Sequence, residues 1–457
     1  MTTAARLVIL GATGDLTGRY LLPALAHLAV AEQLPERLEV LGVARDDWDT
    51  GRFREHALSR LRRHAANVDG AAAERVVGRF GYRPGDVTDP AVLDACVEGA
   101  GGPVVVYLAL PPSLFAPVVA GLAGSRLPTG SRIVVEKPFG TDLDSAASLN
   151  DLLHRSFPEE AVFRMDHFLG KQTVQNVLGL RFANRLFDPL WCAEHVERVD
   201  IVWDETVALE GRAGYYDHAG ALRDMVQNHL LQLLCLVAME RPSGLGERPL
   251  RDAKVAVLRQ VRRLTADEVA GQSVRARYAA GRIGDRAVPA YVQEPGVDGD
   301  RRTETFAEVT LFVDSHRWRG VPFRLRSGKA LGMDSREIRL QLRPLERLPF
   351  GQPDEVGPNV ITLSMDPDRL AADIALNGAG EPFCLDPARL EVVLAPQELP
   401  AYARLLLDAF EGDPILSIRA DEAEECWRIV EPVLAAWDAG AAPLLEYPAG
   451  SGGPTAG

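Results

Sequence analysis

The stretch LVILGATGDLTGRYLLPAL, residues 7–25, decides how the first part of the chain folds. Four apolar residues lead directly into Gly11, and a helical pattern of leucines begins a few residues later. This order predicts a buried strand, a glycine turn and a helix. Glycines at the turn let backbone N–H groups approach a pyrophosphate, and the helix N-terminus favours an anion. The candidate binding residues of this turn are Gly11, Thr13, Gly14, Asp15 and Leu16.

The turn departs from the usual dinucleotide fingerprint, because it reads G-x-x-G-D-L-T instead of G-x-G-x-x-G. Taken alone, this pattern also suits a tight connection between a strand and a helix. Its context favours a nucleotide-binding turn. A second apolar run, residues 38–44, is followed by Arg45, and the ribose of a bound nucleotide would contact this strand end. Arg45 could hold a 2′-phosphate and Asp46 could accept from a free 2′-hydroxyl; the alternative is a solvated loop.

Up to about residue 165, short apolar runs alternate with helical patterns. Alternation of strands and helices implies βαβ units and a parallel sheet. The apolar runs are RLVIL (6–10), LEVLGVA (38–44), PVVVYLAL (103–110) and SRIVVEKPF (131–139).

The remainder of the chain has runs in which apolar and polar residues alternate, which is typical of an antiparallel sheet with one covered face. These runs are VERVDIVWDE (196–205), FAEVTLFVD (306–314), VPFRLRS (321–327), EIRLQLRPL (337–345) and NVITLSMD (359–366), with helical patterns at 221–240 and 420–437. We therefore predict α/β plus α+β architecture. A Rossmann-like parallel-sheet domain would span residues 1–165, and a larger domain on an antiparallel sheet with helices would span residues 166–457.

Composition narrows the function. The 457 residues carry a net charge of −14, which argues against nucleic acid or an anionic membrane as the main partner but allows a small anionic ligand in a basic pocket. Five scattered cysteines show no C-x-x-C and no metal-ligand spacing, so we expect a reducing cytoplasm and no metal. No apolar run approaches the roughly 18 residues of a membrane span, and the N-terminal run is too short for a signal peptide.

The segment FRMDHFLGKQTVQN, residues 163–176, gathers three kinds of reactive group. Asp166, His167 and Lys171 fall within six positions, between apolar residues. A carboxylate, an imidazole and an ammonium so close together are rare in a plain core segment. We expect this segment to form a short helix that serves a substrate.

Two further segments carry candidate groups. VVEKPFG (134–140) places Lys137 at the carboxyl end of a strand, where open α/β sheets bind ligands, although a surface lysine is the alternative. The proline after Lys137 makes a cis bond possible. GALRDMVQNHLLQ (220–232) carries Asp224 and His229, which are five positions apart and so do not share one face of an α-helix. A lone histidine on such a helix is more often structural than catalytic.

Five blocks occur in the order and spacing of glucose-6-phosphate dehydrogenases, and the chain resembles that family nearly from end to end. The blocks are GATGDLTGRYLLPAL, VEKPFG, RMDHFLGKQTVQNVLGLRFANRLFDPLW, EGRAGYYDHAGALRDMVQNHLLQ and VPFRLRSGKAL. The resemblance implies oxidation of C1 of glucose 6-phosphate to 6-phosphogluconolactone, the first step of the oxidative pentose phosphate pathway, with hydride transfer to NADP or NAD. It also implies a Rossmann-like domain, a C-terminal domain on an antiparallel sheet, and a homodimer or homotetramer.

The same resemblance implies roles for individual residues. His229, in Q-N-H, would be the base for the C1 hydroxyl, and Asp166 would hold its imidazole and stabilise the imidazolium. His167 and Lys171 would bind the sugar phosphate by charge-assisted hydrogen bonds. The other residues implied for the substrate are Glu205, Asp224, Lys329 and Lys137, of which Lys137 also lies towards the cofactor.

Three residues depart from the family pattern. Phe168 replaces the tyrosine of D-H-Y-L-G-K and removes a hydroxyl donor to the phosphate. Asp334 falls near a position where some relatives carry a cation, and Cys192 stands where L-W-N is usual. The alternatives are a relative acting on another hexose phosphate such as glucosamine 6-phosphate, a non-catalytic dinucleotide sensor, or an inositol or glucose–fructose type dehydrogenase. The last would lack D-H-x-L-G-K.

Overall fold

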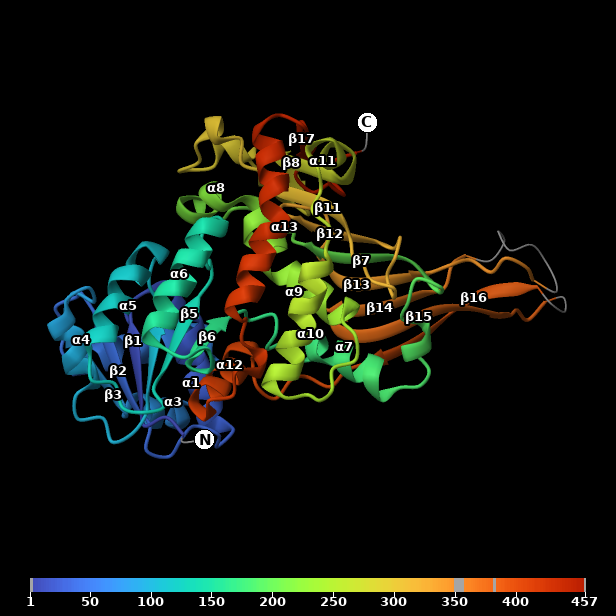
Figure 1. The fold of residues 1–457 in the computed structure, drawn as a ribbon. Coiled ribbons are helices and arrows are strands. Elements are labelled where there is room, and N and C mark those ends of the chain that lie inside the picture. Colours follow the sequence, from blue (N-terminus) through green and yellow to red (C-terminus); the bar gives the residue numbers. More distant parts are fainter. Residues whose placement is uncertain (1–2, 349–356, 381–383, 456–457) are drawn as a thin grey trace. The chain divides into compact units, whose positions relative to one another are not determined.

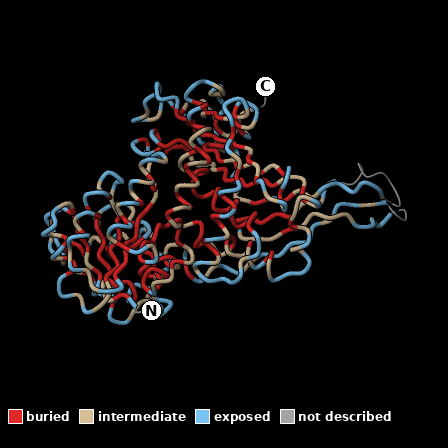
Figure 2. The backbone as a smooth tube through the Cα atoms, viewed as in Figure 1, coloured by how far each residue is buried: buried red, intermediate tan, exposed pale blue. Residues whose placement is uncertain are grey.

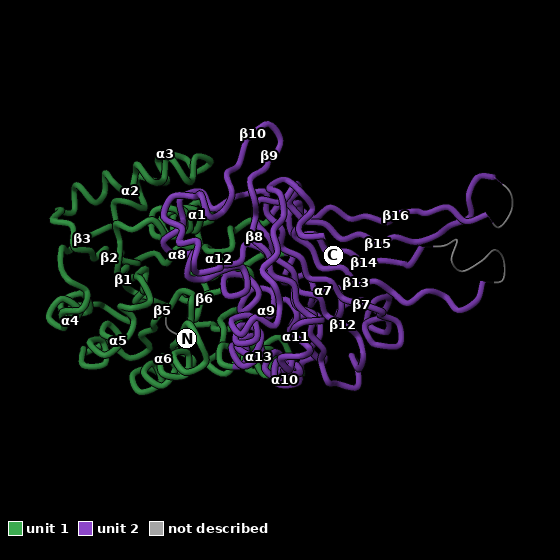
Figure 3. The backbone as a smooth tube through the Cα atoms, turned by 90° about the horizontal axis from the view of Figure 1, so that it is seen from above, with its two compact units in different colours: residues 1–172, 243–252, 397–424 green, residues 173–242, 253–396, 425–457 purple. Residues whose placement is uncertain are grey.

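The computed structural model describes residues 3–348, 357–380 and 384–455. The chain forms two compact units (Figure 3): the first comprises residues 1–172, 243–252 and 397–424, and the second comprises residues 173–242, 253–396 and 425–457. Each unit therefore draws on segments that are far apart in the sequence. The functional boundary expected after residue 165 stays a prediction. In the described ranges, none of the helices combines the length and apolar character that a membrane crossing requires.

The first unit is built on a six-stranded parallel sheet with the order β3-β2-β1-β4-β5-β6 (Figure 1). Its strands are β1 Arg6–Leu10, β2 Glu39–Ala44, β3 Phe80–Pro84, β4 Val104–Leu108, β5 Arg132–Glu136 and β6 Val162–Met165. Strands β4 and β5 are buried at every residue, as expected when helices cover both faces of a sheet. The predicted parallel sheet is confirmed. The strand order reverses between β1 and β4, and such a switch point is where open α/β sheets bind ligands.

Two groups of helices accompany this sheet. α1 contacts α2, α3 and α12, α2 also contacts α3, and α5 contacts α4 and α6. Their bounds are η1 Thr17–Leu21, α1 Leu22–Val30, α2 Thr50–His64, α3 Gly70–Val77, α4 Pro90–Val97, α5 Phe115–Gly124, α6 Leu143–Ser156 and α12 Ala401–Glu411. Asp49, Asp69, Asp89 and Asp142 cap α2, α3, α4 and α6, because each side chain accepts a hydrogen bond from an amide of the first turn.

The second unit is built on a nine-stranded sheet with the order β16-β15-β14-β13-β7-β12-β11-β8-β17. The pairs β7–β12 and β8–β17 are parallel and the other pairs are antiparallel. The prediction of a larger domain on an antiparallel sheet is confirmed, with these two parallel pairs added. The strands are β7 Val196–Asp204, β8 Ser273–Ala279, β11 Phe306–Phe312, β12 Pro322–Gly328, β13 Ser335–Leu342, β14 Val360–Met365, β15 Asp368–Asn377, β16 Leu385–Val393 and β17 Leu444–Pro448.

Helix α9, Leu231–Ala238, of the second unit is buried at every residue; Figure 2 shows the burial along the chain. Its last carbonyl groups have no partner within the helix. Trp191 Nε1 donates to the carbonyl of Val237, and Trp318 Nε1 donates to that of Ala238, both at 2.8 Å. The other helices are α7 Gln172–Ala183, α8 Ala213–Ala221, η5 Leu222–Leu230, α10 Glu247–Gln260, α11 Ala266–Gln272 and α13 Ala420–Asp438, of which α7, α10 and α13 include residues of both units.

Candidate active site

The glycine turn follows β1 at the switch point of the parallel sheet. Gly11 has φ +89°, and a Cβ atom there would lie 2.2 Å from the carbonyl oxygen of Ala109, just after β4. Only glycine fits this conformation and this close approach. The N–H groups of Gly11 and Ala12 both donate to the carbonyl of Val43, at 2.8 and 3.1 Å. The turn is therefore fixed against both strands that flank β1.

A helix begins at Asp15, directly after the turn, and continues through Leu16 into η1 and α1. Amide groups in the first turn of a helix have no intrahelical acceptor, so they can donate to an anion. Thr17 Oγ1 donates to the carbonyl of Gly11 at 3.1 Å and ties the helix back to the turn. This local structure is the one predicted for residues 7–25, and it fits the phosphates of a dinucleotide.

The end of β2 lies against the same turn. Asp46 accepts a hydrogen bond from Thr13 Oγ1 at 2.7 Å, and the hydroxyl of Tyr82 donates to the backbone carbonyl of Asp46, also at 2.7 Å. Arg45 is exposed. The Asp46 carboxylate is thus held at the glycine turn. A cation and a carboxylate therefore both stand at the strand end where a ribose would be read.

Strand β5 ends at a buried carboxyl group that the sequence reading missed. Glu136 accepts a hydrogen bond from the hydroxyl of Tyr107 on β4 and another from Tyr402 on α12. Burial is the largest cause that raises the pKa of Glu136, from an ordinary 4.5 to about 7, and the Tyr107 hydrogen bond opposes it. Lys137 follows at once and is joined to Pro138 by a cis peptide bond, as the sequence suggested.

This raised pKa predicts how stability depends on pH. Between about pH 4.5 and pH 7 the folded protein keeps the Glu136 proton that the unfolded chain has lost, so the free energy of unfolding falls as pH rises. Glu136→Gln removes this term. Its stability relative to wild type should therefore rise with pH by up to about 1.4 kcal/mol per pH unit in this window. Urea unfolding across the window measures it, with exposed Glu160→Gln as the control expected to give no slope. A flat Glu136→Gln difference would contradict the assignment.

The segment that carries Asp166 and Lys171 is a strand end followed by a turn, so the expected short helix was wrong. Asp166 follows β6, is buried, and accepts the N–H of Phe168 through Oδ1 at 2.9 Å. Such a side-chain bond to the amide two residues on favours a turn over a helix. Residues 167–170 form the turn, and α7 begins at Gln172.

Aromatic contacts bring the two predicted phosphate ligands together. The imidazole of His167 stacks on the ring of Tyr402, with centroids 5.6 Å apart, and meets the edge of Phe168 at 5.0 Å. Lys171 Nζ lies 5.7 Å from the centre of the same Phe168 ring. Phe168, where tyrosine is usual in the family pattern, therefore packs beside both His167 and Lys171 but offers no hydroxyl.

Two predicted sugar-binding residues meet at the ends of the parallel strands β7 and β12. Glu205 and Lys329 follow these strands directly, and Lys329 Nζ lies 2.6 Å from Glu205 Oε2. The Lys329 side chain is buried and also lies over the ring of Tyr216, at 5.2 Å. Asp334 lies nearby, because its Oδ1 accepts the N–H of Thr206 at 2.7 Å. A carboxylate thus stands close to the pair where some relatives are expected to carry a cation.

Asp224 and His229 lie on η5, which is a π-helix. Its hydrogen bonds run from residue i to i+5, so residues five apart lie nearly above one another, and the α-helical argument that separated these two was wrong. His229 is buried, and its backbone N–H donates to Asn228 Oδ1 at 2.6 Å. Asp224 lies within 3.5 Å of the Tyr215 hydroxyl. A buried histidine and a half-exposed carboxylate are held on one wide helix, and π-turns of this kind are frequent at functional sites.

The proposed residues thus form four groups. The first unit holds the glycine turn with the end of β2, and the cluster of Lys137, Asp166, His167 and Lys171 beside Glu136 and Tyr402. The second unit holds the Glu205–Lys329 pair and the π-helix with Asp224 and His229. The roles of these residues stay predictions. The first unit offers two lysines for an anionic ligand and an anion cradle at a switch point, and the second unit offers a buried imidazole and a lysine paired with a carboxylate.

Comparison with known proteins identifies one family. A model of the glucose-6-phosphate dehydrogenase NAD binding domain matches residues 8–176, and a model of the C-terminal domain of glucose-6-phosphate dehydrogenase matches residues 178–457. The curated glucose-6-phosphate 1-dehydrogenase of Gluconobacter oxydans (strain 621H) is 42% identical over 98% of this chain and 94% of its own length.

Solved structures agree with these matches. The glucose-6-phosphate 1-dehydrogenase of Mycobacterium avium is 38% identical and superposes with a TM-score of 0.88, covering 99% of this chain and 96% of its own. A glucose-6-phosphate dehydrogenase in complex with its substrate glucose-6-phosphate is 30% identical, with a TM-score of 0.89 and the same coverage. This chain therefore belongs to the glucose-6-phosphate dehydrogenase family.

Proposed function

We propose that this protein oxidises C1 of glucose 6-phosphate to 6-phosphogluconolactone with NADP or NAD, the first step of the oxidative pentose phosphate pathway. The observation that carries the proposal is the similarity, over nearly the whole chain, to a solved dehydrogenase that holds glucose 6-phosphate. The reaction removes a hydride from C1 and a proton from the hydroxyl on C1. When bound, the nicotinamide supplies the hydride acceptor.

The residues of this chain would then divide the remaining work. His229 would take the hydroxyl proton, and Asp166 would stabilise the resulting imidazolium. His167 and Lys171 would hold the phosphate, while Glu205 and Asp224 would accept from sugar hydroxyls. Lys329, paired with Glu205, would orient that carboxylate and add a further cation for the substrate. Lys137 would add a cation beside the cofactor, which the glycine turn would hold by its phosphates.

A matrix of substrates and coenzymes tests this function. Glucose 6-phosphate, glucosamine 6-phosphate and free glucose are each assayed with NADP and NAD, following reduced nicotinamide by absorbance. We expect glucose 6-phosphate to give the highest kcat/KM. A preference for glucosamine 6-phosphate would identify a specialised relative. Dinucleotide binding without turnover of any of the three would instead identify a sensor.

Coenzyme choice should depend on the two opposing charges at the end of β2. Arg45 can clamp a 2′-phosphate, whereas the Asp46 carboxylate, held at the turn by Thr13, repels it and accepts from a free 2′-hydroxyl. We therefore expect both coenzymes to work. Arg45→Ala should lower kcat/KM for NADP relative to NAD by about 10–100-fold, the value of one charge-assisted hydrogen bond of roughly 1.5–3 kcal/mol.

Asp46→Ser should do the reverse and improve NADP more than NAD. Asp47→Ser is the matched control, because Asp47 is the exposed neighbour and makes no hydrogen bond or ion pair within the described residues. Steady-state kinetics with both coenzymes measure all three variants. An Arg45→Ala enzyme with an unchanged NADP/NAD ratio would remove this strand end from coenzyme selection.

We further propose that the chain assembles as a homodimer through the β15–β16 end of its sheet, with a tetramer as the alternative outcome. Leu390 is 59% exposed and Val392 is 56% exposed, and both line an apolar hollow with Leu186 and Leu370. Apolar patches on an edge strand are normally covered.

Sedimentation of Leu390→Glu should show a smaller species than wild type, because a two-fold interface contains the change twice. Leu245→Glu, an exposed leucine elsewhere, should not. Unchanged mass for Leu390→Glu would place the interface elsewhere.

A further inference from the structure

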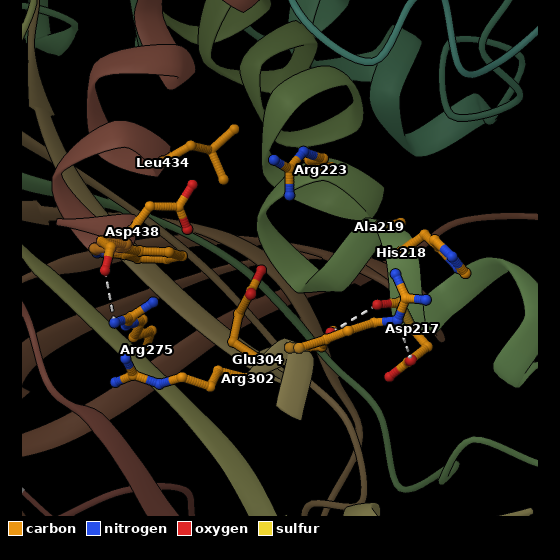
Figure 4. Close-up of a pocket in the computed structure, with 12 residues that line it drawn as sticks. Asp217, His218, Ala219, Arg223, Arg275, Arg302, Glu304, Leu434 and Asp438 are labelled. Carbon is orange, nitrogen blue, oxygen red and sulfur yellow. Dashed lines mark hydrogen bonds and ion pairs between the residues drawn. The ribbon is translucent and has the colours of Figure 1, made fainter. Parts of the chain in front are cut away.

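The second unit contains a polar cavity of about 310 Å³ that none of the proposed coenzyme or sugar residues lines. It lies between the junction of α8 with η5, the segment 301–304, strand β8 and the C-terminal end of α13 (Figure 4). Its volume falls within the range of small-molecule sites. The lining residues that matter here are Arg223, Arg275, Arg301, Arg302, Glu304 and Trp437.

Two of the four arginines are held in place by the protein and form walls, although Nη1 of Arg275 has no hydrogen-bond partner within the described residues. Arg301 pairs with Asp217 at 3.2 Å and with Asp298 at 3.5 Å. Arg275 is buried, donates to the carbonyl groups of Trp437 and Ala442, and lies over the Trp437 ring. These contacts fix the shape of the cavity without a ligand.

The other two arginines have no such partner. Within the described residues, the side chains of Arg223 and Arg302 make no hydrogen bond and no ion pair. Figure 4 shows the side chain of Arg302 running towards Arg275 on one side of the cavity, and Arg223 on the other side. Arg302 also has a left-handed backbone, with φ 56°, which is costly for a residue other than glycine. The repulsion between the like charges of Arg302 and Arg275 is relieved when an anion binds between their guanidinium groups.

Two carboxyl groups lie between these two ends, those of Asp438 at the end of α13 and of Glu304 (Figure 4). Glu304 is buried and accepts the N–H of Leu222 through Oε1 at 3.0 Å. Gly220 makes room for it, since a Cβ atom there would lie 2.4 Å from the carboxylate. Burial raises the pKa of Glu304, and its carboxyl oxygens can accept a hydrogen bond from a ligand hydroxyl group.

We propose that this cavity binds a small polyhydroxylated dianion, with one phosphate or carboxylate group at Arg302 and Arg275, another at Arg223, and hydroxyls facing Glu304. Sugar bisphosphates and phosphorylated sugar acids share this chemistry. Arg223 directly precedes Asp224 on η5, so occupancy is coupled to the sugar-binding helix and regulates it. The regulatory part rests on the proposed function, whereas binding itself does not.

Titration calorimetry of the whole protein tests binding independently of turnover. The probes are fructose 1,6-bisphosphate and 6-phosphogluconate, with inorganic phosphate as the fragment that carries a single anionic group. Arg302→Ala should weaken binding of a probe dianion by at least about tenfold, the loss expected for one charge-assisted hydrogen bond. Arg319→Ala, an exposed arginine outside the cavity, should not change it.

Lys171→Ala separates the cavity from the proposed substrate site, because its loss should leave the Arg302-dependent binding in place. The proposal is overturned if Arg302→Ala leaves the binding of both organic probes unchanged. It is also overturned if Lys171→Ala abolishes all probe binding. If Arg302-dependent binding occurs without dehydrogenase activity, the cavity stands and the proposed function fails.

A separate observation concerns the turn before β7. Cys192, Glu194 and His195 each offer a ligand atom, and these atoms lie within 4.8 Å of one another. The turn is held in place because the carbonyl of Cys192 accepts from the N–H groups of both His195 and Val196, at 3.0 and 2.8 Å. Thiolate, carboxylate and imidazole are the ligands that zinc prefers. Within the described residues, the side chains of Glu194 and His195 make no hydrogen bond or ion pair.

The geometry points to a divalent zinc-class site with these three ligands and one water, in contrast to the sequence expectation of no metal. Tetrahedral zinc holds its ligand atoms about 3.6 Å apart, so small side-chain rotations would bring these three atoms to that spacing.

Cobalt titration of the whole protein should produce a thiolate-to-cobalt charge-transfer absorption. Cys192→Ser should abolish it, His195→Gln should weaken cobalt binding at least about tenfold, and Cys384→Ser, an exposed cysteine elsewhere, should retain it. An absent band in wild type, or a band that survives Cys192→Ser, would overturn the site.

Discussion

Replacing His229 with asparagine should lower kcat by about 10²–10⁴-fold, the usual contribution of a positioned general base, with little change in KM. A neutral imidazole can accept the proton of the C1 hydroxyl near pH 7, and an asparagine amide cannot. The backbone around His229 should persist, because its N–H donates to Asn228 and the flanking helix α9 is buried and held at its end by two tryptophans. Steady-state kinetics with saturating coenzyme measure the effect.

Three further variants sharpen this test. Asp166→Asn should also lower kcat, and the double variant should lose less than the product of the two single losses if both residues act as one unit. His316→Asn, an exposed histidine of the same unit, is the matched control and should retain full activity. Near-normal kcat in a folded His229→Asn enzyme would remove His229 from the chemistry.

The parts of the fold that could be predicted are those in which local pattern and tertiary burial agree. β1, β2, β4 and β5 are continuous apolar runs because helices cover both faces of their sheet. β3, Phe80–Pro84, was missed because only two of its five residues are buried, so it does not form a continuous apolar run. The π-helix was missed because its hydrogen-bond period differs from that of the α-helix assumed for any apolar periodic segment.

Contacts between distant residues explain what else was missed at the candidate site. In the sequence, Glu136 is simply the last residue of an apolar strand. The hydroxyl groups of Tyr107 and Tyr402 reach its carboxyl group only in the folded chain. The same holds for Asp46, whose bond to Thr13 joins two strand ends. The buried glutamate within V-V-E-K-P was the one available signal, since an ionisable residue rarely ends a fully buried strand without partners. The motif residues were found because their chemistry is local, whereas their partners depend on topology.

The second large effect is expected at Lys171, whose ammonium we propose as a phosphate ligand. Lys171→Ala should raise KM for glucose 6-phosphate by about 10–100-fold, because a charge-assisted hydrogen bond contributes roughly 1.5–3 kcal/mol, while kcat changes less. Oxidation of free glucose should hardly change. Phe168 makes phosphate binding depend more strongly on Lys171. Its ring lies 5.7 Å from Lys171 Nζ and 5.0 Å from the His167 ring but offers the phosphate no hydroxyl.

Phe168→Tyr should therefore lower KM for glucose 6-phosphate, since it restores a donor beside both cations, and it should reduce the penalty of Lys171→Ala. Lys171→Arg is the control for charge and should recover much of the lost affinity. Asp334→Asn provides a second check, because removing a carboxylate beside the Glu205–Lys329 pair should favour any anionic substrate. If Lys171→Ala raises KM equally for glucose and glucose 6-phosphate, the Lys171 ammonium does not bind the phosphate. His167 and Lys171 would then serve the coenzyme or the fold instead.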